Sequence, residues 1–145
     1  MQNRSVPTNI LLPHLVYQDV APAIIWLGKA FGFVEHFRYG NPAHPDGAQI
    51  HRGDAWIQLT TPRENSGTPN SLGGRTQSLT IFVDDITQHY RHSISQRVKI
   101  VEELNETVYG ERQYAAEDLE GHLWIFSQHA KDLSPADWGA TLAQP

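Results

Sequence analysis

The two halves of this chain resemble each other in a fixed order, and this internal repetition constrains the fold more than any other feature. The matches, first half against second, are Asp19 with Asp85, Val20 with Ile86, Ile24 with Tyr90, Tyr39-Gly40 with Tyr109-Gly110, and Gly53-Asp54-Ala55-Trp56-Ile57 with Gly121-His122-Leu123-Trp124-Ile125. Each match is weak alone, but all of them keep the same order along both halves. The order predicts an α+β fold of two tandem βαβββ modules. The alternative is an α+β domain without a repeat.

The first half contains the pattern of one complete module. Residues 10–17 form an apolar run with a proline, which is typical of a strand start or an edge strand. Asp19 is a suitable helix cap and Gly32 a suitable helix end, and apolar residues between them recur at helical spacing. Three short strands are then expected at residues 34–39, 48–51 and 55–60, with turns at 40–42, 45–47 and 53–54.

The second half repeats this pattern after a segment, residues 61–76, that is rich in Pro, Gly, Ser, Thr and Asn and reads as a loop. A strand is expected at 78–83, then a helix capped by Asp84-Asp85, then strands at 100–101, 112–115 and 123–127. The helix places Ile86, Tyr90 and Ile94 on its apolar face, with His89 and His92 on the wetter sides. We therefore expect one domain over 1–145, with module 1 at about 8–62, a linker at about 63–76, module 2 at about 77–130 and a tail at 131–145.

Composition excludes several classes of function. There is no cysteine, so disulfides, cysteine nucleophiles and iron–sulfur ligation are excluded. The net charge is −5 and the eleven basic residues are scattered, which is unlike a nucleic-acid-binding surface. No apolar run reaches the length of a signal peptide or a membrane span. We expect a cytoplasmic protein that binds neither nucleic acid nor membranes.

Two stretches carry a resemblance to a known family. They are Pro13-His14-Leu15-Val16-Tyr17-Gln18-Asp19 leading to Ala30-Phe31-Gly32-Phe33, and Gly110-Glu111-Arg112-Gln113-Tyr114 leading to Asp118-Leu119-Glu120-Gly121-His122-Leu123-Trp124-Ile125-Phe126. The chain resembles the vicinal-oxygen-chelate superfamily of glyoxalases, bleomycin-resistance proteins and extradiol dioxygenases, over residues 10–129. The resemblance implies a cup-shaped mixed sheet with helices on its outer face, a cavity inside, and a homodimer.

The resemblance also implies four metal-ligand positions, one on the first and one on the last strand of each module. In this sequence they fall on Leu12, Ser78 and, on or near, Ile57 and Ile125. These side chains are not a competent ligand set for a divalent ion. A shift of one residue would substitute Gln58 and Phe126, which still supply no carboxylate. We expect no bound metal and no other cofactor.

Strand alternation indicates where a ligand would lie. If Leu79, Ile81 and Val83 pack against a helix, then Ser78, Thr80 and Phe82 face the cup, and His14 is expected to join them in one concavity. Arg112 and Tyr114 share one strand face and are candidates for an anion clamp beside a phenol. The predicted ligand-binding residues are His14, Ser78, Thr80, Phe82, Arg112 and Tyr114. For each, an ordinary structural or solvated role is the alternative, and Trp56 and Trp124 are expected in the core.

Three functions remain open from the sequence. The first is a bleomycin-resistance-like protein that binds a small organic molecule, planar or cationic, without metal. The second is a metal-dependent lyase or dioxygenase of the same superfamily with an atypical site, which rests on fold analogy. The third is an interaction domain with an exposed apolar patch. Neither a phosphate-binding loop nor a G-x-S-x-G motif is present in the sequence.

Overall fold

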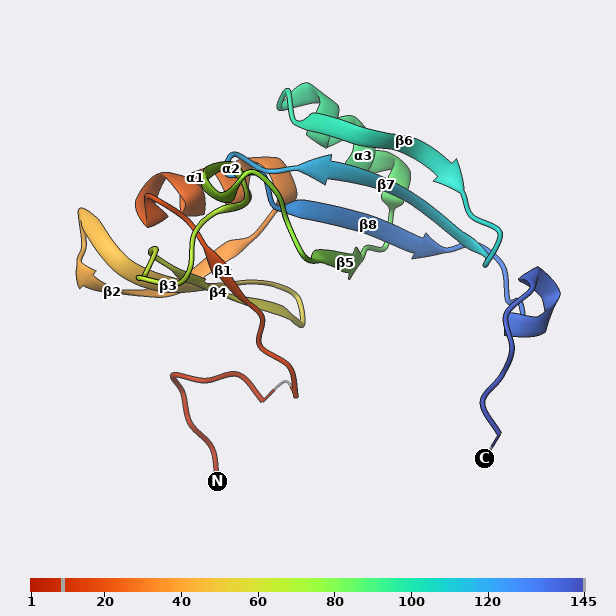
Figure 1. Cartoon of the computed structure of the whole chain (residues 1–145), viewed down its shortest axis with the longest axis horizontal. Helices are drawn as coiled ribbons and strands as arrows, with labels where there is room; N and C mark the ends of the chain where they lie inside the picture. Colours follow the sequence, from red (N-terminus) through yellow and green to blue (C-terminus); the bar gives the residue numbers. More distant parts are fainter. Residues whose placement is uncertain (9, 145) are drawn as a thin grey trace. The chain divides into compact units, whose positions relative to one another are not determined.

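The structure, a computed structural model, describes residues 1–8 and 10–144. Its contacts divide the chain into two compact units. Unit 1 comprises Met1–Thr76 and Leu119–His122, and unit 2 comprises Gln77–Asp118 and Leu123–Pro145. Each unit holds one four-stranded sheet and one long helix (Figure 1). The predicted α+β class with tandem βαβββ modules is therefore confirmed.

Unit 1 contains the first sheet. Its elements are β1 (His14–Val16), α1 (Val20–Phe31), β2 (Val34–Asn41), β3 (His44–Arg52), β4 (Ala55–Thr60) and the short α2 (Pro69–Leu72). The strand order is β1-β4-β3-β2, with β1 parallel to β4 and the other pairs antiparallel. Helix α1 connects the two edge strands, β1 and β2, and packs against β3 and β2.

Unit 2 repeats this topology. Its elements are β5 (Ser78–Phe82), α3 (Ile86–Ser95), β6 (Lys99–Glu106), β7 (Glu111–Glu117), β8 (Leu123–His129) and a short 3₁₀ helix (Pro135–Trp138). The strand order β5-β8-β7-β6, with β5 parallel to β8, matches that of unit 1. No helix of residues 1–8 and 10–144 is both long and apolar enough to span a membrane.

The helix ends follow the sequence signals. Asp85 caps α3, since its carboxylate accepts a hydrogen bond from the Gln88 N–H at 3.0 Å. Asp19 stands at the same position of α1 without a side-chain cap bond. Gly32 ends α1 with φ +83°, a left-handed conformation that costs glycine little because it has no Cβ.

The core of each unit lies between its helix and the facing side of its sheet. In unit 1 the buried strand residues on that side include Leu15, Ala48, Ile50, Ile57 and Leu59. In unit 2 they include Ile81, Tyr114, Trp124 and Phe126. We call the opposite side of each sheet its open face. No long helix of the same unit covers that face.

Several local predictions were wrong. The segment 45–47 was expected as a turn but belongs to β3. The strand can contain Pro45 because this residue lies beyond the pairs with β4 and pairs only with Gly40 of β2. The loop 61–76 contains α2, which is held by a capping box between Thr68 and Ser71. Trp56, expected in the core, is only partly buried and lies on the open face, because it pairs with His51 one residue out of phase with Ile57.

The α3 prediction also needs correction, because His89 is buried and Ile94 is about half exposed. The His89 ring packs in a tilted orientation against Phe126 with 4.1 Å between ring centroids, and its Nδ1 lies 2.6 Å from the Tyr114 hydroxyl. Ser93 shares that hydroxyl at 2.7 Å. The inner face of α3 is therefore partly polar, and apolar spacing alone could not find it.

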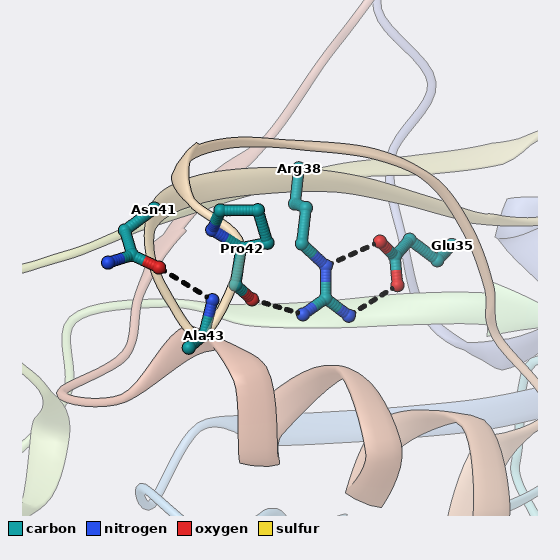
Figure 2. A network of polar contacts seen from close by, with 5 residues as sticks. All are labelled: Glu35, Arg38, Asn41, Pro42 and Ala43. Atoms are coloured by element: carbon teal, nitrogen blue, oxygen red, sulfur yellow. Dashed lines mark hydrogen bonds and ion pairs between the residues drawn. The ribbon is translucent and has the colours of Figure 1, made fainter.

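A charged network stabilises the β2–β3 hairpin of unit 1 (Figure 2). The Arg38 guanidinium donates two hydrogen bonds of 2.7 Å to the Glu35 carboxylate and one of 2.9 Å to the Pro42 carbonyl. The hydrogen bond from the Arg38 side chain lowers the pKa of Glu35, with burial opposing it and the charge of Arg38 adding to it, and the hydrogen bond to Glu35 raises the pKa of Arg38. The Asn41 side chain accepts from the Ala43 N–H at 2.9 Å and shapes the turn.

Candidate functional site

The alternation predicted for β5 is confirmed. Ile81 and Val83 are 8% and 6% exposed, whereas Phe82 is 57% exposed. Ser78 and Thr80 are exposed on the same side as Phe82. An exposed phenylalanine on a sheet face is a surface on which a ring could stack. That these three residues contact a ligand remains a prediction.

A polar cluster lies beside Phe82 on the open face of unit 2. Phe82 pairs with Ser127, and the His129 ring lies 4.9 Å from the Phe82 ring, centroid to centroid. Glu111, which pairs with His129 across β7 and β8, places one carboxylate oxygen 2.6 Å from His129 Nδ1. Its second oxygen accepts a hydrogen bond of 3.3 Å from the Ser127 hydroxyl. These four side chains are the candidate site of unit 2.

The candidate site adjoins an open hollow of about 440 Å³ lined by His129, Ala130, Lys131 and Asp132. The Glu111 side chain is 16% exposed and that of His129 is 76% exposed, so the carboxylate is shielded while the imidazole meets solvent. Because Glu111 occupies Nδ1, Nε2 is the ring nitrogen left to bind a ligand or exchange a proton with it. The site can thus offer a ring surface and a carboxylate-oriented imidazole, whereas the Ser127 hydroxyl is buried and serves to hold the Glu111 carboxylate.

Sequence reasoning missed Glu111, Ser127 and His129. They come together because antiparallel pairing of β7 and β8 places Glu111 opposite His129, and parallel pairing of β5 and β8 places Phe82 opposite Ser127. The signal was present in the strand alternation. It could not be used before the pairing of the strands was known.

Arg112 and Tyr114 do not join this site. They lie on the helix-covered side of the unit 2 sheet, opposite to Phe82, since Tyr114 pairs with the buried Phe126. Arg112 donates a hydrogen bond of 3.1 Å to the Thr87 hydroxyl on α3. Tyr114 has no exposed surface. The expectation of an anion clamp is therefore corrected: Arg112 and Tyr114 take part in the packing between the sheet and the helix.

His14 lies on the open face of unit 1. It is exposed, it pairs with Gln58 of β4, and Leu15 beside it is buried on the helix side. Gln58 in turn pairs with Gln49 of β3. The side-chain amide of Gln49 donates a hydrogen bond of 3.2 Å to the side-chain oxygen Oε1 of Gln58. His14 is thus next to a polar pair in the middle of its sheet.

The metal ion that the resemblance implies does not fit the residues present. Ile57 is 2% exposed on the helix side, so Gln58, not Ile57, occupies the open-face position beside His14. The corresponding position of unit 2, opposite Thr80, is Ile125. Neither residue is a strong ligand for a divalent ion. Within residues 1–8 and 10–144, no three or more His, Cys, Asp or Glu side chains are grouped so that they could hold a metal.

The paired topology, with one long helix on one side of each sheet, defines a class of two-module mixed-sheet proteins. Comparison with known proteins identifies the family. Residues 9–126 match the family model of the Glyoxalase/Bleomycin resistance protein/Dioxygenase superfamily, and the chain belongs to this superfamily.

Relatives extend over most of the chain. An uncharacterized protein of Mycobacterium bovis is 29% identical over 133 residues, covering 86% of each chain. The crystal structure of TioX from Micromonospora sp. ML1 is 28% identical, covers 82% of this chain and 97% of its own, and has a TM-score of 0.71. A bleomycin resistance determinant encoded on the transposon Tn5 is 18% identical, covers 84% of this chain and 98% of its own, with a TM-score of 0.67. At that identity the last comparison supports the fold alone.

Proposed function

We propose that this protein binds a small organic molecule, planar or cationic, through side chains on the open faces of its sheets and without a metal ion. The observation that carries the proposal is Phe82, a large aromatic residue left 57% exposed beside the Glu111–His129 pair. A ring surface combined with a few directed polar groups is the usual composition of a small-molecule site. The shielded carboxylate of Glu111 favours a cation or a hydrogen-bond donor over an anion.

The contacts assigned to unit 2 are Ser78, Thr80 and Phe82, to which the structure leads us to add Glu111 and His129. His14 is the contact proposed for unit 1. Membership of a superfamily that includes bleomycin resistance proteins agrees with a binding function. The superfamily also includes dioxygenases, so the fold does not decide between binding and catalysis.

A ligand screen followed by calorimetry tests the proposal. A library of planar neutral and cationic compounds is screened by thermal shift, and the affinity of each hit is compared between wild type and Phe82→Ala. We expect a loss of about tenfold or more, since a lost ring contact is worth at least about 1.4 kcal/mol. The control is Tyr109→Ala, which removes a 42% exposed aromatic residue in the turn before β7. Unchanged affinity in Phe82→Ala would refute the assigned contact.

The second candidate is an enzyme of the same superfamily with an atypical site. The observation that favours it is the Glu111–His129 pair, because a carboxylate-oriented imidazole can accept and return a proton. Elemental analysis of the purified protein separates the two candidates in part. We expect no stoichiometric zinc, nickel, manganese or iron. About one metal per chain, lost in His14→Ala, would support the enzyme.

We further propose a homodimer and a cytoplasmic location. Strands β5 and β6 are the edges of the unit 2 sheet, and exposed edges gain stability when a partner covers them. Light scattering at micromolar concentration should report a dimer, and a monomer would contradict this. The lack of cysteine agrees with a reducing compartment, which cell fractionation can test.

A further inference from the structure

The open face of unit 1 contains a buried acceptor with no partner. Gln49 is 2% exposed, and its carbonyl oxygen Oε1 accepts no hydrogen bond from any of residues 1–8 and 10–144. Its amide nitrogen is used by Gln58, which is itself 8% exposed. Buried polar groups are almost always paired, because losing water without gaining a partner is costly. An unpaired acceptor at the centre of a sheet face therefore points to a donor that residues 1–8 and 10–144 do not supply, and the side chains around the acceptor must shift to admit one.

Aromatic residues occupy strand positions next to Gln49 on the same face. The His51 and Trp56 rings stack with 4.4 Å between centroids and 16° between planes, and His36 meets Trp56 edge-on at 5.3 Å. Phe37, on the neighbouring strand β2, pairs with Gln49. The phenol of Tyr39 lies against Gly47, so closely that a Cβ at Gly47 would collide with it. Flat surfaces of this kind favour flat ligands.

The strand positions around Gln49 also lack formal charge, although the Arg4 carbonyl lies 3.1 Å from His36 Nε2. These positions are occupied by Phe37, His51, Trp56, Gln58 and His14. None of these side chains is a carboxylate, an ammonium or a guanidinium. The charged pair of the same strands, Glu35 and Arg38, lies at positions that pair with the helix-side residues Ile50 and Ala48. A charged ligand would lose its hydration here without finding a counter-charge.

We infer that the open face of unit 1 binds an uncharged planar ring compound through an N–H group that donates to Gln49 Oε1, with the ring against Trp56. The inference deepens the proposed function and rests on it, since it names a chemical class of ligand for the face that carries His14. Lactam and cyclic amide rings have this chemistry: they are flat, neutral, and present an N–H in the ring plane.

Three probes of similar size test separately the need for an N–H donor and the need for a neutral ligand. The first is 2-quinolone, a neutral planar lactam with an N–H. The second is N-methyl-2-quinolone, which keeps the ring and the carbonyl but has no donor. The third is 2-naphthoate, which is planar and anionic. We expect 2-quinolone to bind with a Kd of about 1 mM or tighter, and the other two at least about tenfold more weakly.

The variant Gln49→Leu tests the donor contact directly. Leucine has a similar size and no acceptor, so 2-quinolone should weaken to the level of N-methyl-2-quinolone, and the ratio between the two should fall to about one. The variant removes the unpaired acceptor but also the amide that donates to the Gln58 side chain at 3.2 Å, so we expect only a small net change in stability. Gln88→Leu, which changes an exposed glutamine on α3, is the control and should keep the wild-type ratio.

Nuclear magnetic resonance of the wild-type protein gives a reading that does not depend on the folding of a variant. The indole N–H resonance of Trp56, assigned with Trp56→Phe, should shift with 2-quinolone and much less with the other probes. Equal binding of 2-quinolone and its N-methyl form would overturn the inference, as would an unchanged ratio in Gln49→Leu. A face covered by a second copy of the chain would give no Trp56 shift with any probe, which also overturns it.

The two proposals fail in different ways. If library compounds bind and lose affinity in Phe82→Ala, but 2-quinolone shows no preference over its N-methyl form, the proposed function stands and this inference is wrong. If 2-quinolone behaves as expected and Phe82→Ala weakens no ligand, the contact assigned to Phe82 is wrong and this inference stands. If no compound binds at millimolar concentration, both are refuted.

Discussion

Replacing Tyr114 by phenylalanine should destabilise unit 2 without weakening ligand binding. Tyr114 has no exposed surface, and its hydroxyl lies 2.6 Å from His89 Nδ1 and 2.7 Å from the Ser93 hydroxyl. The substitution keeps the ring and its contact with Phe126 at 5.5 Å. It removes only the atom that both α3 side chains share. The effect therefore reports on the buried hydrogen bonds rather than on packing.

The magnitude follows from those two contacts. Each hydrogen bond contributes about 0.5–1.5 kcal/mol, and a buried group that loses its partner costs about 1–3 kcal/mol. The Ser93 hydroxyl can turn to a carbonyl of the preceding helical turn, which offsets part of the loss. We expect the free energy of unfolding to fall by about 2–4 kcal/mol. For a chain of this length the Tm should fall by roughly 5–15 °C.

Urea unfolding followed by tryptophan fluorescence measures this change, because Trp124 is buried in the same unit and its ring lies 6.4 Å from that of Phe126. The matched control is Tyr109→Phe, which removes a hydroxyl that donates to Gln113 at 3.1 Å on the surface. That change should cost less than about 0.5 kcal/mol. Equal losses in the two variants, or a loss below about 0.5 kcal/mol for Tyr114→Phe, would refute the reasoning. A loss of ligand affinity in Tyr114→Phe, with stability unchanged, would restore the role that the sequence suggested.

Three further predictions concern stability. Ile81→Ala should lower the free energy of unfolding by about 2–5 kcal/mol and Phe82→Ala by less than about 1 kcal/mol, and urea unfolding that reversed this order would contradict the assignment of sheet faces. Arg38→Gln should cost at most about 1 kcal/mol at pH 7, because the pair with Glu35 is partly exposed. The lowered pKa of Glu35 means that this contribution is present above the ordinary carboxyl pKa and is lost as the pH falls through the lowered value, so thermal unfolding of wild type and variant should converge in acid. Gly110→Ala should destabilise more than Gly53→Ala: both have positive φ, but a Cβ at Gly110 would lie 2.5 Å from the Lys131 carbonyl oxygen, whereas at Gly53 nothing lies within 4 Å.

Strand and helix order was accessible from the sequence because it depends on short-range patterns. The alternation of Ile81 and Phe82 predicts opposite faces whatever the partner strands are, and the structure agrees. The caps at Asp85 and Gly32 are local as well, since a cap bonds to residues only a few positions away. The repeat then gave the topology of the second unit from that of the first.

The register in which the strands pair could not be predicted from these short-range patterns. Matching Trp56 with Trp124 by their neighbours placed both in the core, yet the strand registers put Trp56 opposite His51 on the open face and Trp124 opposite Ala116 on the helix side. A displacement of one residue moves a side chain to the other face of a sheet. Sequence similarity between the halves is too weak to exclude such a displacement.

For the candidate site, too, some features followed from the sequence and others required the tertiary structure. The sequence by itself determined the two modules, the exposed Phe82 and the lack of a carboxylate at the expected ligand positions, because these depend on residue identity and local periodicity. Only the tertiary structure decided that Glu111 meets His129, that Tyr114 binds His89, and that Gln49 keeps an unpaired oxygen. The first two facts are contacts between residues at least 18 positions apart, and the third is the absence of a contact. Such contacts are set by the register in which whole strands pair and by the helix that packs on them, which no local pattern specifies.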